Sequence, residues 1–226
     1  MKLSVVIPAY NEENEIAETV ALVKEKGHDL IEEIIVVDGQ STDNTEAEAR
    51  SAGAKVVISP RKGRAAQMNV GAEQASAEIL YFLHADTRPP DDFAESVCDA
   101  IEKGYHAGCF QLTFDEDHFL LDLYAWFTRF DIDAFRFGDQ SLFIQRDVFF
   151  AIEGFREDHI VMEDNEIVRR IKDEYDFTII DEAVETSARL YREVGVLKLQ
   201  FVFFLIYVLY FLGVEQETLA DIKGSL

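Results

Sequence analysis

The chain has 226 residues, of which 48% are hydrophobic, so it is long enough to bury one sizeable core. Its 44 acidic residues outnumber 21 basic ones, which gives a formal net charge of −23. This charge excludes a nucleic-acid-binding surface, which would need a basic stripe, so any anionic ligand must be met by local cations or a metal.

The cysteine content and the first residues indicate a cellular compartment. Cys98 and Cys109 are the only cysteines and form no C-x-x-C pair, which argues against a disulfide scaffold and a thiolate zinc site. Residues 1–8 lead straight into an expected strand, without the charged, apolar and cleavage regions of a signal peptide. We therefore expect a cytoplasmic protein.

The first part of the chain alternates short β-branched runs with amphipathic segments. The runs predict buried strands, and the amphipathic segments predict helices. This alternation indicates βαβ units and a mostly parallel central sheet flanked by helices, which is an α/β fold. The expected strands are residues 3–7, 34–37, 56–58 and 79–83, and the expected helices are residues 11–26, a short segment ending at Ala52, and residues 64–74.

The pattern becomes looser in the second part. We expect helices at residues 91–103, 119–130, 147–153 and 164–174, and strands at residues 107–114, 141–145, 177–180 and 184–188. Because no repeat or low-complexity linker occurs, we expect a single domain over residues 1–226. The last part, residues 191–226, is an apolar helical tail.

The tail contains an unusually apolar stretch. Between Phe201 and Val214 every residue except Gly213 is strongly apolar. As a helix it would rise about 21 Å, whereas a bilayer span needs about 20 residues. Three roles remain open: an interface with a second copy or another partner, burial in its own domain, and peripheral contact with a membrane through residues 201–214.

Several common motifs are absent. No G-x-G occurs, nor a G-x-x-x-x-G-K-[ST] phosphate loop, which disfavours dinucleotide-binding dehydrogenases and P-loop NTPases. The absence of G-x-S-x-G and H-E-x-x-H removes the ordinary α/β-hydrolase and the zincin metalloproteases. A sheet with carboxylates at its strand ends remains.

Acidic residues follow three of the expected strands. Glu12, Asp38 and Asp86 come after them, and parallel strands end at one edge of a sheet, so these side chains could converge on one ligand. His84 and Asp86 are two residues apart on an extended chain and point to the same side, where a carboxylate suits a hard cation. The alternative is a solvated turn after the strand; for Asp38 it is a turn-forming Asp before Gly39.

The densest basic run, residues 61–64, precedes an expected helix. Cations and free N–H groups at a helix N-terminus can bind an anion, although a bare charge run is more often a solvated loop.

Taken in order, these residues resemble the family 2 glycosyltransferases of GT-A fold over roughly residues 1–190. The resemblance rests on Pro8-x-Tyr10-Asn11-Glu12, Val37-Asp38-Gly39-x-Ser41-x-Asp43, Lys62-Gly63 with Asn69, Asp86, and Glu163-Asp164. A finer pattern is similar to the subgroup associated with arsenosugar biosynthesis: His-Ala-Asp-Thr at residues 84–87, Gly138-Asp139-Gln140 and Met162-Glu163-Asp164.

The resemblance implies an inverting enzyme that transfers a sugar from a nucleotide-sugar, usually a UDP-sugar, to a hydroxyl acceptor. It also implies that residues 1–115 form a nucleotide-sugar-binding half and residues 116–190 an acceptor and catalytic half, ahead of the tail at 191–226. Asp86 matches the metal-binding Asp, with Mn²⁺ or Mg²⁺ at the diphosphate. Asp164, beside Glu163, matches the catalytic base, although acids in a first helical turn are also expected from the helix dipole. The implied substrate-binding residues are Pro8, Tyr10, Glu12, Asp38, Ser41, Asp43, Lys62, Arg64, Asn69, His84, Asp139 and Gln140.

The chain departs from the family pattern at His84, where the first Asp of the D-x-D is expected. Imidazole in place of a carboxylate removes a negative charge and changes metal preference. Lys62 and Arg64 could then carry more of the phosphate charge, and Arg189 and Arg192 are further candidate diphosphate contacts.

Two other functions are compatible with such a sheet. A sugar-phosphate nucleotidyltransferase would need a Gly-rich basic loop after the first strand, where this chain is acidic. A non-catalytic nucleotide-binding module could use the apolar tail for assembly, but would not require Glu163-Asp164.

Overall fold

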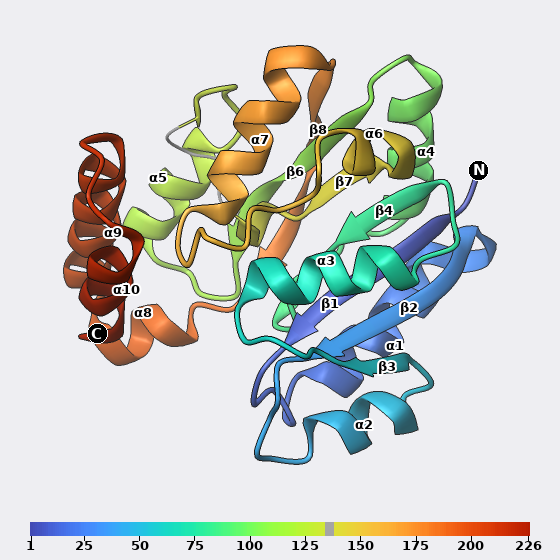
Figure 1. Ribbon diagram of the computed structural model, residues 1–226, viewed down its shortest axis with the longest axis horizontal. Helices are drawn as coiled ribbons and strands as arrows, with labels where there is room; N and C mark the ends of the chain where they lie inside the picture. Colours follow the sequence, from blue (N-terminus) through green and yellow to red (C-terminus); the bar gives the residue numbers. More distant parts are fainter. Residues whose placement is uncertain (134–137) are drawn as a thin grey trace.

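A computed structural model describes residues 1–133 and 138–226 (Figure 1). One eight-stranded sheet runs through it in the order β3-β2-β1-β4-β7-β6-β8-β5. The strands are β1 (Leu3–Ala9), β2 (Ile31–Asp38), β3 (Lys55–Ile58), β4 (Ile79–Phe82), β5 (Thr87–Arg88), β6 (Ala107–Phe114), β7 (Leu142–Gln145) and β8 (Phe177–Thr186).

Helices surround this sheet. They are α1 (Ile16–Gly27), α2 (Thr45–Ser51), α3 (Arg64–Gln74), α4 (Phe93–Glu102), α5 (Phe119–Phe127), α6 (Arg146–Ala151), α7 (Glu163–Glu174), α8 (Arg189–Val194), α9 (Val196–Phe211) and α10 (Gln216–Gly224), with the short 3-10 turns η1 (His28–Leu30) and η3 (Gly138–Gln140).

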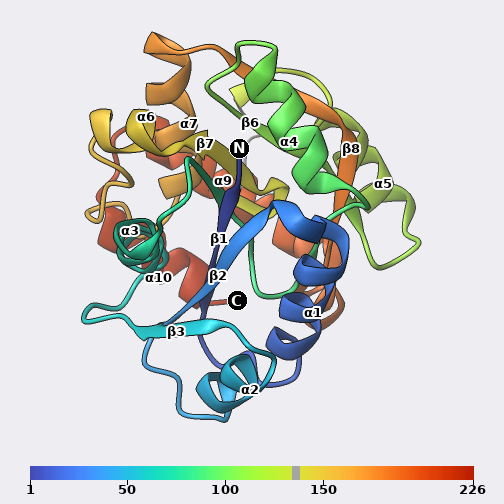
Figure 2. The ribbon, with the colours of Figure 1, turned by 90° about the vertical axis from the view of Figure 1, so that its right-hand side faces the viewer.

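Both faces of the sheet are covered, which explains why its central strands are apolar throughout. In β1, Val5 and Ile7 belong to the hydrophobic cluster that includes residues of α1 and α4, whereas Val6 belongs to the cluster on the α3 and α7 side. Figure 2 shows α3 on one side of β1 and β2, with α1 and α4 on the other. The alternation of strands and helices expected for the first part is confirmed.

The expected mostly parallel sheet is confirmed, although the sheet is mixed. Strands β1 to β4 pair in parallel, but β7 runs antiparallel to both β4 and β6, and β5 runs antiparallel to β8. An antiparallel neighbour needs no crossover connection, because its chain can return from the edge where the previous strand ended.

The two strands expected at residues 177–180 and 184–188 form one strand, β8. Its parallel pairing with β6 shifts register: Phe110 pairs with Ile180, and Gln111 pairs with Ala183. Asp181 and Glu182 are therefore extra residues in the ladder, as in a β-bulge. Their polarity interrupts the apolar pattern, which is why the sequence suggested a break.

The tail packs on the domain through one face only. Leu199, Ile206 and Leu219 are buried, and the last two form a cluster with Val161 ahead of α7. Figure 1 shows α9 and α10, in red, at one end of the molecule. The other face of α9 is exposed and apolar, through Leu197, Phe201, Phe204, Val208, Phe211 and Leu212. Within the described residues no helix is long and apolar enough to cross a membrane.

Removing the tail should therefore destabilise the domain. A chain ending at Gln200 lacks Ile206 and Leu219 and uncovers Val161. Since burial of each large aliphatic side chain is worth about 1.5–3 kcal/mol, we expect the free energy of unfolding to fall by about 4 kcal/mol. Urea denaturation measures it. Phe204→Ala, on the exposed face, is the control and should change stability by less than about 0.5 kcal/mol; equal midpoints for the truncated and full chains would contradict the packing role.

Candidate active site

A polar cleft of about 480 Å³ lies where β1 and β4 end. Glu12 and Asp86 both line it, as expected for loops that leave neighbouring parallel strands at one edge. The other polar or charged lining side chains are Tyr10, Arg64, Gln67, His84, Asp139, Glu163 and Lys223, and Pro8 forms part of its wall. The structure thus brings most of the expected site residues together.

Asp38 lies at the end of β2, is almost fully buried and is not part of the cleft lining. Its Oδ2 accepts a hydrogen bond of 3.0 Å from the backbone N–H of Ser41. Its Oδ1 is buried without a hydrogen-bond partner among the described residues. A buried acceptor is costly to leave unpaired, so this oxygen is suited to a ligand donor.

Ser41 and Asp43 hold the loops after β1 and β2 together. Ser41 Oγ accepts a hydrogen bond of 2.9 Å from the N–H of Asn11. Asp43 accepts from the N–H of Glu13 at 3.2 Å and from the N–H of Thr45 at 3.0 Å, at the start of α2. Neither side chain is part of the cleft lining, so both shape the loops that border it.

Asn69 and Gln140 are also structural in their contacts. Asn69 donates to the carbonyl of Phe155 at 2.8 Å and accepts from its N–H at 2.9 Å, which ties α3 to the loop after α6. Gln140 is buried and donates to the carbonyl of Phe110 at 3.2 Å. Neither residue lines the polar cleft, so the cleft lining does not include the two substrate contacts that the sequence predicted.

The basic run before α3 divides into two environments. Lys62 is exposed, with its Nζ 5.9 Å from the centre of the Tyr10 ring. Arg64 turns inward: its Nε donates to Glu163 Oε1 at 2.5 Å, and its Nη2 lies 3.5 Å from Asp164 Oδ2. Gly63 makes this turn possible, since its φ of 114° is strained for any other residue.

Glu163 and Asp164 begin α7 as neighbours with opposite electrostatic behaviour. Burial raises the pKa of both, but the Arg64 guanidinium outweighs it at Glu163, whose pKa is lowered. At Asp164 burial and the neighbouring Glu163 charge prevail over Arg64 and raise the pKa to about 6. Asp164 is 16% exposed, against 1% for Glu163, so it is the accessible carboxylate of the two. Such a raised pKa is typical of a general base.

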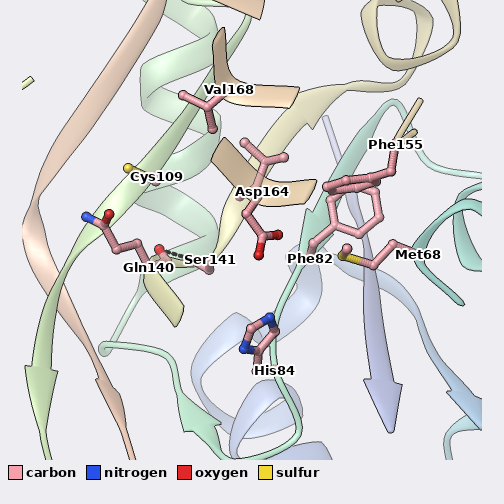
Figure 3. Close-up of a pocket in the computed structure, with 10 residues that line it drawn as sticks. Met68, Phe82, His84, Cys109, Gln140, Ser141, Phe155, Asp164 and Val168 are labelled. Atoms are coloured by element: carbon pink, nitrogen blue, oxygen red, sulfur yellow. Dashed lines mark hydrogen bonds between the residues drawn. The ribbon is translucent and has the colours of Figure 1, made fainter. Parts of the chain in front are cut away.

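His84 is oriented by Asp139. Its Nδ1 lies 3.0 Å from Asp139 Oδ1, and this hydrogen bond raises the pKa of the imidazole against the opposing effect of burial. In Figure 3 the Asp164 carboxylate points toward the His84 ring across a small pocket walled by Phe82 and Phe155. His84 therefore hydrogen-bonds one carboxylate, Asp139, and faces a second, Asp164.

Asp86 is a carboxylate whose negative charge is only partly balanced by the nearby His84 and Arg189. Burial is the main cause that raises its pKa, and Asp139 adds to it against the opposing effects of His84 and Arg189. No cluster of three or more His, Cys, Asp or Glu side chains in the described part of the chain could hold a metal alone. One or two carboxylates combined with substrate phosphates are nevertheless a usual Mg²⁺ site, and Asp86 fits that arrangement.

The two arginines after β8 differ in their contacts. Arg189 donates to both carboxylate oxygens of Glu12, at 3.1 and 3.3 Å, at the edge of the polar cleft. Arg192 pairs with Asp115 at 3.2 Å and Glu116 at 3.3 Å, beyond the end of β6, and is not part of the cleft lining.

Two cleft residues were not predicted from the sequence. Gln67 donates to the carbonyls of Ala9 at 2.9 Å and Val37 at 2.8 Å, and so fixes the ends of β1 and β2. Lys223 reaches the cleft from α10, in the segment expected to be only apolar. In the sequence, Lys223 is the one basic residue of the acidic segment 215–226, and this could have indicated a role in binding an anion.

The cleft and the sheet define a GT-A-type transferase domain, and comparisons with known proteins specify its family. Residues 4–156 match the glycosyl transferase family 2 profile. The chain belongs to this family, and therefore carries a glycosyltransferase domain.

Among curated relatives, it is 35% identical over 97 residues to glucosyl-3-phosphoglycerate synthase of Mycolicibacterium smegmatis, covering 39% of this chain and 32% of the relative. It is 29% identical over 109 residues to dolichol-phosphate mannosyltransferase of Pyrococcus furiosus, covering 46% of this chain and 31% of the relative. The chain thus spans about a third of the length of these relatives.

Solved structures agree with the fold. The mannosyltransferase PcManGT of Pyrobaculum calidifontis, in complex with GDP-Man and Mn²⁺, has a TM-score of 0.67 at 18% identity, over 81% of this chain and 56% of that one. S. aureus TarS 1–349 in complex with UDP-GlcNAc has a TM-score of 0.66 at 18% identity, over 83% and 58%. The GT-A fold expected from the sequence is confirmed.

Proposed function

We propose that the protein is an inverting glycosyltransferase that takes a sugar from a nucleoside diphosphate sugar, with UDP as the first choice, and transfers it to a hydroxyl acceptor. The observation that carries the proposal is Asp164: a partly accessible carboxylate whose pKa is raised to about 6. It lies beside Glu163, which lines the polar cleft, and it lines an adjoining apolar chamber.

The donor occupies the polar cleft in this proposal. The unpaired Oδ1 of Asp38 accepts a hydrogen bond from the base or ribose, and the Tyr10 ring with Lys62 covers the nucleotide from the solvent side. Arg64 faces the cleft as well, but its charge is already matched by Glu163 and Asp164. Lys223, which lines the cleft, is therefore the cation better able to meet the diphosphate. Arg189 is paired with Glu12 at the edge of the cleft and would have to exchange this partner to do so.

Asp86 is the residue that would hold a divalent ion, Mn²⁺ or Mg²⁺, together with oxygens of the diphosphate. When bound, this ion neutralises negative charge on the leaving diphosphate. His84 stands where the family has a carboxylate, and an imidazole brings no negative charge to the ion. Its Nδ1 is instead engaged by Asp139.

Asp164 acts as the base. It accepts the proton of the acceptor hydroxyl, whose oxygen then attacks the anomeric carbon from the side opposite the diphosphate. The bond between this carbon and the diphosphate breaks, and the electron pair leaves with the diphosphate. A single displacement of this kind inverts the anomeric centre.

The Asp86 role is testable by calorimetry. We expect Mn²⁺ to increase the affinity of the wild-type protein for UDP by at least about tenfold. Asp86→Ala should remove this increase, since a carboxylate ligand is lost. Chelation of the metal should bring wild type and variant to similar UDP affinities. Identical UDP affinity of the wild-type protein with and without Mn²⁺ would exclude the metal role.

Three finer expectations stay predictions: the division into donor half, acceptor half and tail, the similarity to the arsenosugar-associated subgroup, and contact of residues 201–214 with a second copy or a membrane surface. The donor is best sought first in a thermal-shift screen of nucleotide-sugars, because a ligand that binds the folded state raises the melting temperature.

A further inference from the structure

A second cavity of about 220 Å³ adjoins the polar cleft. Asp86, Arg64, Asp139 and Lys223 line both cavities, so they form the boundary between them. Beyond this boundary the chamber has an apolar wall, formed mainly by Phe114, Tyr124, Tyr191, Leu199, Phe203 and Ile206. The polar residues of its remaining lining are Asp164, Asn165, Thr186 and Ser187.

The apolar wall comes from segments that are distant in the sequence. Phe114 ends β6, Tyr124 belongs to α5, and Tyr191 belongs to α8. The remaining three side chains belong to α9, so the tail helix supplies much of this wall. The chamber therefore exists because the tail packs across the end of the sheet.

The Tyr191 ring adds apolar surface to the wall, because its hydroxyl is already hydrogen-bonded. The Tyr191 hydroxyl accepts a hydrogen bond of 3.0 Å from Gln200 Nε2, and its ring packs edge-on against Phe114 with centroids 5.3 Å apart. The chamber has room for several water molecules and therefore for a short alkyl chain.

Asp164 also lines the chamber, together with the boundary residues. A hydroxyl held at this polar end would be within the reach of the base, while whatever carries the hydroxyl would extend along the apolar wall. The polar end of the chamber holds three carboxylates, the boundary residues Asp86 and Asp139 together with Asp164, against two cations, Arg64 and Lys223. This excess of negative charge disfavours a second anion here.

We propose that this chamber binds the apolar portion of the acceptor, so that the acceptor is a neutral amphiphilic alcohol with an alkyl or similar apolar group next to the reacting hydroxyl end. The proposal rests on the proposed glycosyl transfer and specifies its acceptor class. The hydroxyl proton passes to Asp164, the new bond joins the acceptor oxygen to the anomeric carbon, and the diphosphate leaves with the electron pair.

Binding of alkyl glucosides with different chain lengths tests this proposal. We expect octyl β-glucoside, below its micelle concentration, to bind more tightly than methyl β-glucoside, by up to about fourfold for each methylene that the chamber accommodates. Titration calorimetry gives both affinities. UDP binding is measured separately in the same samples, so that failure of the donor site and failure of the chamber are distinguished.

Two variants at one buried position should act in opposite directions. Ile206→Trp fills the chamber and should abolish the preference for the octyl chain, whereas Ile206→Ala enlarges it and should favour the decyl over the octyl chain. Phe204→Ala lies on the exposed face of the same helix and should leave the preference unchanged.

Equal affinity for octyl and methyl glucoside, with UDP binding intact, would overturn the chamber proposal and leave the glycosyltransferase proposal standing. Loss of octyl binding in Phe204→Ala but not in Ile206→Trp would overturn it too, because the chain would then lie on the outer face of α9. A preference controlled by Ile206 in a protein that binds no UDP or UDP-sugar would support the chamber and reject UDP as donor nucleotide.

Discussion

Asp164→Asn is expected to lower the rate of sugar transfer by about 10²–10⁴-fold while UDP-sugar affinity is retained. The amide is nearly the same size as the carboxylate but cannot accept the acceptor proton. Steady-state transfer kinetics and calorimetry with the donor separate the two effects. Asp173→Asn, an exposed position on the same helix, is the matched control and should transfer at the wild-type rate.

The same assignment predicts a pH profile. A base must be deprotonated to act, so transfer should be slow below the raised pKa of Asp164, about 6, and should increase as the pH rises through it. The Asn variant should lack this rise. Unchanged turnover in Asp164→Asn, or a wild-type rate that falls as the pH rises from 5 to 7, would exclude Asp164 as the base.

Arg64→Met is expected to cost about 3 kcal/mol of unfolding free energy, because it leaves the buried Glu163 carboxylate without its partner. For a domain of this size, that corresponds to a melting temperature lower by roughly 2–4 °C for each kcal/mol. Arg61→Met is the control: its pair with Glu157 is exposed, so the loss should stay below about 1 kcal/mol. Urea denaturation of both variants gives the comparison.

The pH dependence of this loss follows from the direction of the Glu163 shift. Since the pKa of Glu163 is lowered in the folded protein, its contribution is full above the ordinary pKa and is lost as the pH falls through the folded value. The gap between wild type and Arg64→Met should therefore be largest above the ordinary pKa of 4.5 and should narrow as the pH falls below it. The double variant Arg64→Met/Glu163→Met should recover stability; a double variant as unstable as the single one would contradict the ion-pair explanation.

The sequence predicted the first half of the fold well, because buried parallel strands and amphipathic helices have strong local patterns. It also placed Glu12 and Asp86 at one edge of the sheet. The direction of β7 was not predictable, since a strand has the same apolar pattern in either direction. The break expected within β8 reflected two polar residues, Asp181 and Glu182, which a bulge accommodates.

The tail and the loop residues were harder to predict for a different reason. An apolar helix can face its own domain or a partner with the same composition, so the sequence left the position of α9 open. Lys223 enters the cleft only because α9 and α10 fold back over it. Ser41, Asp43 and Asn69 belong to the family pattern, but their hydrogen bonds maintain loop geometry.

The ion pair between Arg189 and Glu12 joins positions 177 residues apart. It is partly exposed, so breaking it costs at most about 1 kcal/mol. In the proposed function Glu12 is therefore an exchangeable counter-ion, which an arriving diphosphate would replace at the Arg189 guanidinium at little cost. Arg189 directly precedes Leu190 and Tyr191, which line the chamber, so the start of α8 borders both cavities.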